Sequence, residues 1–158
     1  MKKSNSNFEV HNVSPLNGEV RGLIEQLNRF NLNLYSREEC RLESAEHLFE
    51  KKADMVGVFD KDQLVGIGAV KQMEGYAEVK RMFVQDAYRG TGVAATILEA
   101  LEDIARKNGN TIIRLETGAL HKAALKFYHK MGYYRIRQFG DYPVNDVSVL
   151  MEKKIGTL

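Results

Sequence analysis

The sequence predicts a mixed α/β domain built around one central sheet. Two observations carry this prediction: apolar residues recur at helical spacing in some segments and at strand spacing in others, and the two kinds of segment alternate along the chain. The predicted order is β-α-α-β-β-β-α-β-α-β-β. A third observation is the length of 158 residues, which suits a single domain over residues 1–158.

The N-terminal part of the chain predicts one strand and two helices. Residues 8–13 carry apolar side chains and predict the first strand. Ser14 precedes a proline and suits the cap of a helix over residues 15–29, where apolar residues follow at helical spacing. Residues 31–40 are polar and predict an irregular segment, and residues 44–52 predict a short second helix.

A β-hairpin is predicted next. Residues 55–59 and 64–70 are apolar runs, and the short segment that joins them is polar. In the second arm, Gly66 and Gly68 lie on the same face of the strand. Glycines in a strand mark a place where another element approaches closely, so we expect close packing there.

Residues 77–84 predict another strand, in which alternation assigns each side chain to one of two faces. One face would carry Glu78, Lys80, Met82 and Val84, and the other Val79, Arg81 and Phe83. A loop then leads into a long helix over residues 92–107, whose apolar residues follow the i, i+3, i+4, i+7 pattern.

The C-terminal part predicts three strands and one helix. Residues 111–116 form an apolar strand, and residues 121–131 form a helix that Gly132 ends. Residues 133–138 and 147–153 are the last two strands. An exposed edge strand such as the last one can pair between subunits, so the sequence permits a homodimer.

Composition excludes several classes of protein. The single cysteine, Cys40, excludes a disulfide framework and a multi-cysteine zinc site, and we expect it to be a non-catalytic thiol. The four histidines show no metal-ligand spacing, so no metal is expected. A net charge of +2 is too balanced for an obligate nucleic-acid binder.

Targeting and membrane signals are not found in the sequence. No apolar run follows the charged start, as a signal peptide would require. No stretch approaches the ~18 consecutive apolar residues of a membrane helix. We therefore expect a cytoplasmic protein without membrane contact, in which residues 1–7 are frayed.

The segment with the clearest chemical meaning is a strand that feeds a glycine loop and then the long helix. The first amides of a helix have no internal partner and lie at the positive end of its dipole, so they bind anions. Gly90 and Gly92 leave room for a phosphate to reach the backbone, and Ala94 keeps the next position small. The loop lacks the Lys-Ser/Thr pair of a Walker A motif. Alternatively, the glycine loop is only a tight turn that binds no ligand.

The loop reads Arg89, Gly90, Thr91, Gly92, Val93 and Ala94. It resembles Arg/Gln-x-x-Gly-x-Gly/Ala, the pyrophosphate signature of the GNAT superfamily of acetyl-CoA-dependent N-acetyltransferases. Residues 124–133 resemble the second signature of that superfamily, an alanine-bearing helix with a Tyr before a Gly-aromatic step. The element order is also similar, and the resemblance covers the chain from Phe8 to Lys153.

The resemblance implies a mostly antiparallel central sheet, flanked by helices, whose central strands 77–84 and 111–116 splay apart around acetyl-CoA. The pyrophosphate would bind the amides of residues 89–94. The pantetheine arm would pair with the backbone of the segment Met82, Phe83 and Val84. The Met82 N–H would donate to the thioester carbonyl, where negative charge develops during attack by an amine.

The resemblance also implies two catalytic residues. Tyr128 matches the family tyrosine that protonates the leaving thiolate. Alternatively, Tyr128 is an aromatic residue of the core, and the two roles are compatible. Glu78 is the candidate base, acting directly or through water, since only a neutral amine attacks. Alternatively, Glu78 is only a charged residue at the end of a strand.

Cofactor contacts at the start of the second signature are less standard. His121 stands where many members carry an Asn that contacts CoA, and capping the helix is its alternative role. Lys122 and Lys126 lie one turn apart and would attract the 3′-phosphate of CoA, unless they form only a solvated helix face.

Residues 31–41 and 139–143 are loop-like and would form the walls of the acceptor pocket. Candidate contacts are Tyr35, Arg37, Arg41, Arg81 and Tyr142. An arginine there would pair with a carboxylate, which favours a small amino-acid-like or peptide amine as acceptor, attacked directly in a ternary complex.

Three alternatives stay open at this point. Acidic residues near the same loops keep a polycationic acceptor open; they are Glu38, Glu39, Glu43, Asp141 and Asp146. A protein acetyltransferase that acts on an N-terminus or a lysine is the second alternative. A non-catalytic acetyl-CoA sensor or interaction domain is the third.

Overall fold

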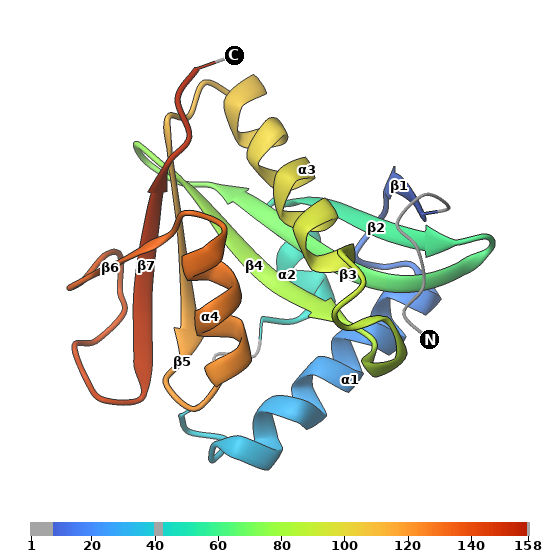
Figure 1. The fold of residues 1–158 in the computed structure, drawn as a ribbon, viewed down its shortest axis with the longest axis horizontal. Coiled ribbons are helices and arrows are strands. Elements are labelled where there is room, and N and C mark those ends of the chain that lie inside the picture. Colours follow the sequence, from blue (N-terminus) through green and yellow to red (C-terminus); the bar gives the residue numbers. More distant parts are fainter. Residues whose placement is uncertain (1–7, 40–42, 158) are drawn as a thin grey trace.

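The structure is a computed structural model that describes residues 8–39 and 43–157. Within these residues, seven strands form one sheet in the order β1-β2-β3-β4-β5-β7-β6, and four helices cover it (Figure 1). The elements are β1 (Phe8–Asn12), α1 (Gly18–Leu34), α2 (Ala45–Glu50), β2 (Asp54–Asp60), β3 (Gln63–Gln72), β4 (Ala77–Val84), a 3₁₀ turn (Asp86–Tyr88), α3 (Val93–Lys107), β5 (Ile112–Gly118), α4 (Lys122–Lys130), β6 (Tyr134–Ile136) and β7 (Ser148–Lys154).

Helix α1 begins later and ends later than the sequence predicts. Its N-cap is Asn17 and not Ser14, because the Asn17 side chain accepts hydrogen bonds from the first free amides of the helix at 2.9 and 3.3 Å. At the other end, the Tyr35 N–H still donates to the Asn31 carbonyl at 2.9 Å. Residues 31–34 are therefore helical, and the predicted irregular segment begins only after them.

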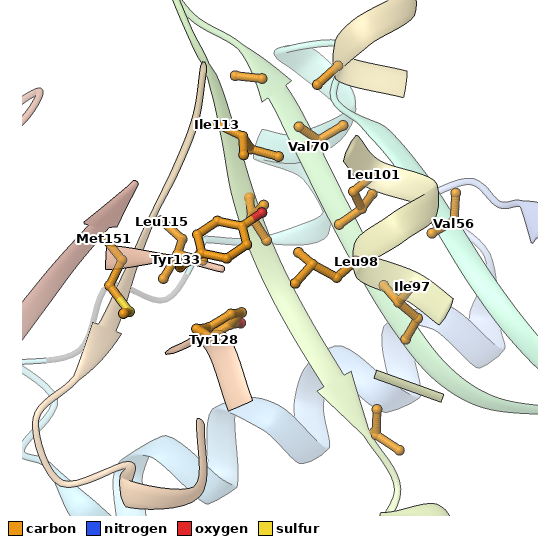
Figure 2. Close-up of a cluster of buried hydrophobic side chains, with 14 of the residues drawn as sticks. Val56, Val70, Ile97, Leu98, Leu101, Ile113, Leu115, Tyr128, Tyr133 and Met151 are labelled. Atoms are coloured by element: carbon orange, nitrogen blue, oxygen red, sulfur yellow. The ribbon is translucent and has the colours of Figure 1, made fainter. Parts of the chain in front are cut away.

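The helices form two layers, one on each face of the sheet. Helices α1 and α2 pack on one face through an apolar cluster that includes Val20, Leu23 and Leu48. Helices α3 and α4 cover the other face (Figure 1). Figure 2 shows the larger cluster on that face, where Leu98 and Leu101 of α3 lie beside strand β4, with Tyr128 of α4 among the same buried residues.

Gly66 and Gly68 of β3 confirm the predicted close packing, because helix α3 lies directly over them. A Cβ built on Gly66 would lie 2.8 Å from Val93 Cγ1. A Cβ on Gly68 would lie 2.5 Å from Ile97 Cγ2 and 3.1 Å from Leu101 Cδ1. Only glycine allows α3 to approach β3 this closely.

We expect Gly68→Ala to lower the melting temperature of the protein by several degrees. The added methyl overpacks the α3–β3 contact, which costs about 1–3 kcal/mol. Gly22→Ala on α1 is the matched control: nothing lies within 4 Å of its Cβ, so it should stabilise the helix by ~0.5–1 kcal/mol. Thermal unfolding followed by circular dichroism checks both; equal melting temperatures for the two variants would contradict the packing argument.

The sheet is mostly antiparallel and its central strands separate, as expected. Strands β4 and β5 are its parallel neighbours and pair only at Ala77↔Ile113 and Glu78↔Arg114. Beyond these pairs the strands diverge toward their C-terminal ends (Figure 1). The C-terminal part of β4 therefore has no ladder partner on the β5 side within the described residues.

A β-bulge interrupts β4 beside this opening. Strand β3 pairs Ile67 with Phe83 but Ala69 with Lys80, so that Gly68 faces two residues of β4, Arg81 and Met82. Arg81 takes the left-handed conformation, with φ of 54°. The bulge puts one extra residue into the alternation of side chains along the strand.

The predicted faces of β4 are consequently wrong beyond Lys80. Arg81 donates a hydrogen bond to Asn28 of α1, so it lies on the α1 and α2 face together with Lys80. Met82 packs instead against the cluster under α3 and α4. Glu78 and Met82 therefore do not share a face, although their spacing predicts it.

The C-terminal strands also differ from the prediction. Strand β7 lies between β5 and β6, so the last strand is not an edge; β1 and β6 are the edges of the sheet. Strand β6 is shorter than predicted, because the chain after it leaves the sheet. There Phe139 and Tyr142 are buried in a small cluster of their own.

Candidate active site

A cavity lies where β4 and β5 diverge, and both layers of the protein contribute to its walls. Met82, Leu115 and Tyr128 come from the α3 and α4 side, and Lys80 and Arg81 come from the α1 and α2 side. The other residues that line it are Leu27, Asn31, Glu43, Val79, Glu116, Thr117, Gly118, His121 and Tyr142. The gap between the strands thus connects the two faces of the sheet.

Tyr128 lies at this gap and is buried (Figure 2). Its hydroxyl lies 3.6 Å from Met82 Sδ. Burial raises the pKa of the Tyr128 hydroxyl, and the negative charge of Glu116 raises it further. Tyr128 therefore holds its proton at neutral pH and can donate it to a group that gains negative charge beside it.

The start of helix α3 has the features of an anion site. Gly90 and Gly92 have φ of 74° and 91°, which favours glycine. Gly92 is the N-cap and provides no side-chain cap, and the first turn carries no acidic residue. The first amides of α3 are thus left for an external anion. Val93 is fully buried, which fixes the helix start against the core.

Side chains of the loop anchor it without covering those amides. The Thr91 hydroxyl donates to the Tyr88 carbonyl. Arg89 pairs with the exposed Asp86 at 2.9 Å, and its guanidinium lies 5.2 Å from the ring centre of Phe30. Ala94 is partly buried against the core.

The residues of β4 that are expected to bind pantetheine can do so only through their backbone. The Val84 side chain is buried in the core, and the Phe83 side chain points to the α1 and α2 face. Met82 lines the cavity with its side chain. Because β4 lacks a ladder partner here, its backbone can pair with an extended group.

Glu78 lies in a buried polar network on the α1 and α2 face. Its carboxylate accepts a hydrogen bond from the Tyr142 hydroxyl at 2.6 Å and pairs with Lys80 Nζ at 2.7 Å. Lys80 Nζ also lies 3.5 Å from Glu43, whose other oxygen accepts from Lys71 at 2.9 Å. Glu78 itself does not line the central cavity, but Tyr142 and Lys80 do.

Glu43 stays ionised in this network. Burial alone would raise the pKa of its carboxyl, but the hydrogen bond from Lys71 and the charge of Lys80 outweigh burial and lower it. A second cavity opens on this side, between α2 and the loop at 140–142, and Glu43, Lys80 and Tyr142 line both cavities. The network is therefore the wall between the two.

His121 lines the central cavity, and Lys122 and Lys126 are exposed on α4. The His121 ring lies between two aromatic rings, with centroids 5.3 Å from Phe30 and 5.6 Å from Tyr35. Burial lowers the pKa of His121, so the imidazole is neutral at neutral pH. Its side chain makes no capping hydrogen bond to α4.

The predicted acceptor residues divide into two groups. Arg81 and Tyr142 line the cavity. Tyr35 does not: its ring lies against Gly118 and its hydroxyl accepts from the Leu120 N–H at 2.5 Å, so it supports the turn before α4. Arg37 is exposed and away from the cavity. Arg41 and Cys40 lie outside the described residues.

Five polar residues of the cavity wall are not among the individual site residues that the sequence predicts: Asn31, Glu43, Lys80, Glu116 and Thr117. Lys80 and Glu116 each follow a buried apolar residue in their strands, and this pattern could have placed them opposite the core. Asn31 and Glu43 belong to the segments around the first two helices, and only the tertiary fold brings them to β4 and β5.

The part of the chain that the structure describes lacks two further features. No group of three or more His, Cys, Asp or Glu side chains there has the arrangement to hold a metal ion. None of the helices there combines the length and apolar character needed to cross a membrane.

Comparison with known proteins agrees with this geometry. Residues 20–133 match the model of the Acetyltransferase (GNAT) family. The "IAA acetyltransferase" of Azospirillum brasilense is 34% identical over 151 residues, which cover 94% of this chain and 99% of that protein. The "N-acetylaspartate synthetase" of Danio rerio is 33% identical over 82 residues, which cover 51% of this chain and 29% of that protein.

Solved structures show the same fold. A protein from Klebsiella pneumoniae subsp. pneumoniae, whose name proposes an acyl-CoA N-acyltransferase, has a TM-score of 0.82 and 27% identity and covers 96% of this chain and 100% of its own. The PaiA N-acetyltransferase of Thermoplasma acidophilum, solved in complex with coenzyme A, has a TM-score of 0.74 and 22% identity over 93% of this chain and 98% of its own. The splayed strands, the bare start of α3 and these matches agree, and the chain belongs to the GNAT family as an acetyl-CoA-dependent N-acetyltransferase.

Proposed function

We propose that the protein transfers the acetyl group of acetyl-CoA to the primary amine of a small amino-acid-like or peptide acceptor, by direct attack in a ternary complex. The observation that carries this proposal is the cavity between β4 and β5. Tyr128 reaches it from one side of the sheet and Arg81 with Tyr142 from the other. Donor and acceptor can therefore meet in the gap from opposite faces.

The residues at the start of α3 fit the diphosphate of acetyl-CoA. The amides of residues 89–94 would bind it, since neither a cap nor an acidic side chain competes with it there. The backbone of Met82 and Val84 would pair with the pantetheine arm, and the Met82 N–H would donate to the thioester carbonyl. Lys122 and Lys126 are exposed on α4 and would attract the 3′-phosphate.

The chain's own groups would manage two protons. Tyr128 would give its proton to the leaving thiolate, because the raised pKa keeps it protonated until then. Glu78 would take the proton that the amine loses, by way of the Tyr142 hydroxyl, which bonds Glu78 and also lines the cavity. Glu116 is a carboxylate that lines the cavity directly, and it is the comparison that tests this role.

The acceptor class follows from the positive groups on the cavity wall. The Arg81 guanidinium is held by Asn28 and by the Ile24 carbonyl of α1, and it lines the cavity close to the reacting centre. An arginine at this place favours an acceptor that carries a carboxylate near its amine. The name of the relative "N-acetylaspartate synthetase" also supports an amino-acid acceptor.

A thiol-release assay against a panel of amines tests the proposal. The panel should contain free amino acids, dipeptides, polyamines, aminoglycosides and an unfolded protein with free lysines. Turnover on amino acids or dipeptides is the expected result. Turnover on proteins alone would replace the proposal with a protein acetyltransferase, and binding of acetyl-CoA without turnover on any amine would indicate a sensor.

A further inference from the structure

Two buried polar atoms of residues that line the central cavity have no hydrogen-bond partner in the part of the chain that the structure describes. They are Asn31 Oδ1, on the last turn of α1, and His121 Nε2, at the start of α4. Figure 1 shows these two helix ends near each other beneath the diverging ends of β4 and β5. Both residues line the same cavity as Met82 and Tyr128.

Orphaned polar atoms of this kind point to a ligand. A buried donor or acceptor without a partner costs about 1–3 kcal/mol, and native proteins rarely tolerate it outside functional sites. The His121 ring packs against Phe30 and Tyr35, with ring centres 5.3 and 5.6 Å away, at the wall of the cavity.

The chemistry of the two atoms defines the group that fits between them. A side-chain carbonyl oxygen such as Asn31 Oδ1 can only accept a hydrogen bond. Since burial lowers the pKa of His121, its imidazole is neutral and one ring nitrogen can accept as well. Two acceptors require a ligand group with at least two N–H bonds. The thioester and phosphates of acetyl-CoA offer none and each pantetheine amide offers only one, whereas a primary ammonium offers three.

The position of His121 at the start of α4 places the bound ligand group near the reacting centre. His121 and Tyr128 are seven residues apart, which is two helical turns, and they lie on the same face. Side chains on a helix lean toward its N-terminus, so Tyr128 leans toward His121. A group bound between His121 and Asn31 thus faces the cavity in which Tyr128 acts.

We propose that His121 Nε2 and Asn31 Oδ1 together bind the amine nitrogen of the acceptor, by accepting two of its N–H bonds. This assignment rests on the proposed function and makes His121 an acceptor-binding residue instead of a CoA contact.

The test uses variants that keep the shape of each side chain and remove the polar atom: His121→Phe and Asn31→Leu. Each should raise KM for the best amine of the panel about 10- to 100-fold, the scale of one hydrogen bond to a charged group. The affinity for CoA, measured by calorimetry, should not change. Asn31→Asp keeps an oxygen acceptor and should keep KM near the wild-type value. His129→Phe and Asn33→Leu alter exposed residues of the same helices and should leave KM unchanged.

The possible outcomes separate this inference from the proposed function. A wild-type KM in both variants would overturn it and assign the two atoms to a buried water. Weaker CoA binding with an unchanged amine KM would overturn it in favour of a cofactor contact. If the wild-type enzyme turns over no amine at all, the proposed function fails and this assignment fails with it. If both variants lose their fold, the KM of Asn31→Asp decides: it should stay near wild type, and a large rise would overturn the inference.

Discussion

We expect Tyr128→Phe to lower kcat by about 100-fold or more while the affinity for CoA stays the same. The variant removes one hydroxyl, whose nearest polar contact is Met82 Sδ at 3.6 Å, and it keeps the ring that packs in the core. The loss of a general acid commonly costs 10²–10⁴-fold in rate. Steady-state kinetics and calorimetry with CoA measure the two quantities.

Tyr133→Phe is the matched control, because Tyr133 is buried in the same cluster with its ring centre 5.8 Å from that of Tyr128 but does not line the cavity. Its kcat should stay near wild type. A similar loss in both variants would show that packing, and not proton donation, is responsible. An unchanged kcat in Tyr128→Phe would remove Tyr128 from the mechanism.

The pH profile gives a second check on Tyr128. Burial and the charge of Glu116 raise the pKa of its hydroxyl, so the acid stays protonated above the usual tyrosine value of about 10. We therefore expect no fall in kcat from ionisation of Tyr128 between about pH 7 and pH 10. A limb with a midpoint within this range that disappears in Tyr128→Phe would contradict the raised pKa.

The second large effect is expected for Glu78→Gln, which should lower kcat/KM by about 100-fold. Glutamine keeps a hydrogen bond to Tyr142 and removes the group that takes the proton of the amine. Steady-state kinetics with the best amine of the panel measure this loss. Lys80 retains Glu43 as a partner at 3.5 Å, so Lys80 keeps one of its two ion pairs.

Glu116→Gln is the control for this prediction, since Glu116 is a carboxylate that lines the cavity directly. The variant should keep kcat/KM near the wild-type value. If Glu116→Gln strongly lowers kcat/KM and Glu78→Gln does not, Glu116 is the base, and Glu78 only holds Lys80 and Tyr142 in place.

The local structure of the segments that depend on neighbouring residues in the chain was predicted correctly. The glycine loop and the apolar stripe of α3 are properties of contiguous residues, and a helix with a bare N-terminus follows from them. The spacing of Gly66 and Gly68 likewise indicated the place where α3 packs. These features depend on the chemistry of neighbours in the chain.

The errors arise where tertiary contacts override a regular period. The left-handed residue Arg81 shifts the alternation of β4, and strand periodicity alone gives no sign of it. The extra turn of α1 brings Asn31 to His121 across a large separation in sequence. The order of the last strands is likewise set by pairing, because β7 inserts beside β5.

The central claim is that the start of α3 binds a diphosphate and directs a thioester into the gap between β4 and β5. A crystal structure of the protein with acetyl-CoA tests this most directly. The account predicts diphosphate oxygens within about 2.7–3.2 Å of amide nitrogens in residues 89–94, and the thioester carbonyl at the Met82 N–H beside Tyr128. A diphosphate bound elsewhere on the protein, or a thioester outside the gap, would contradict it.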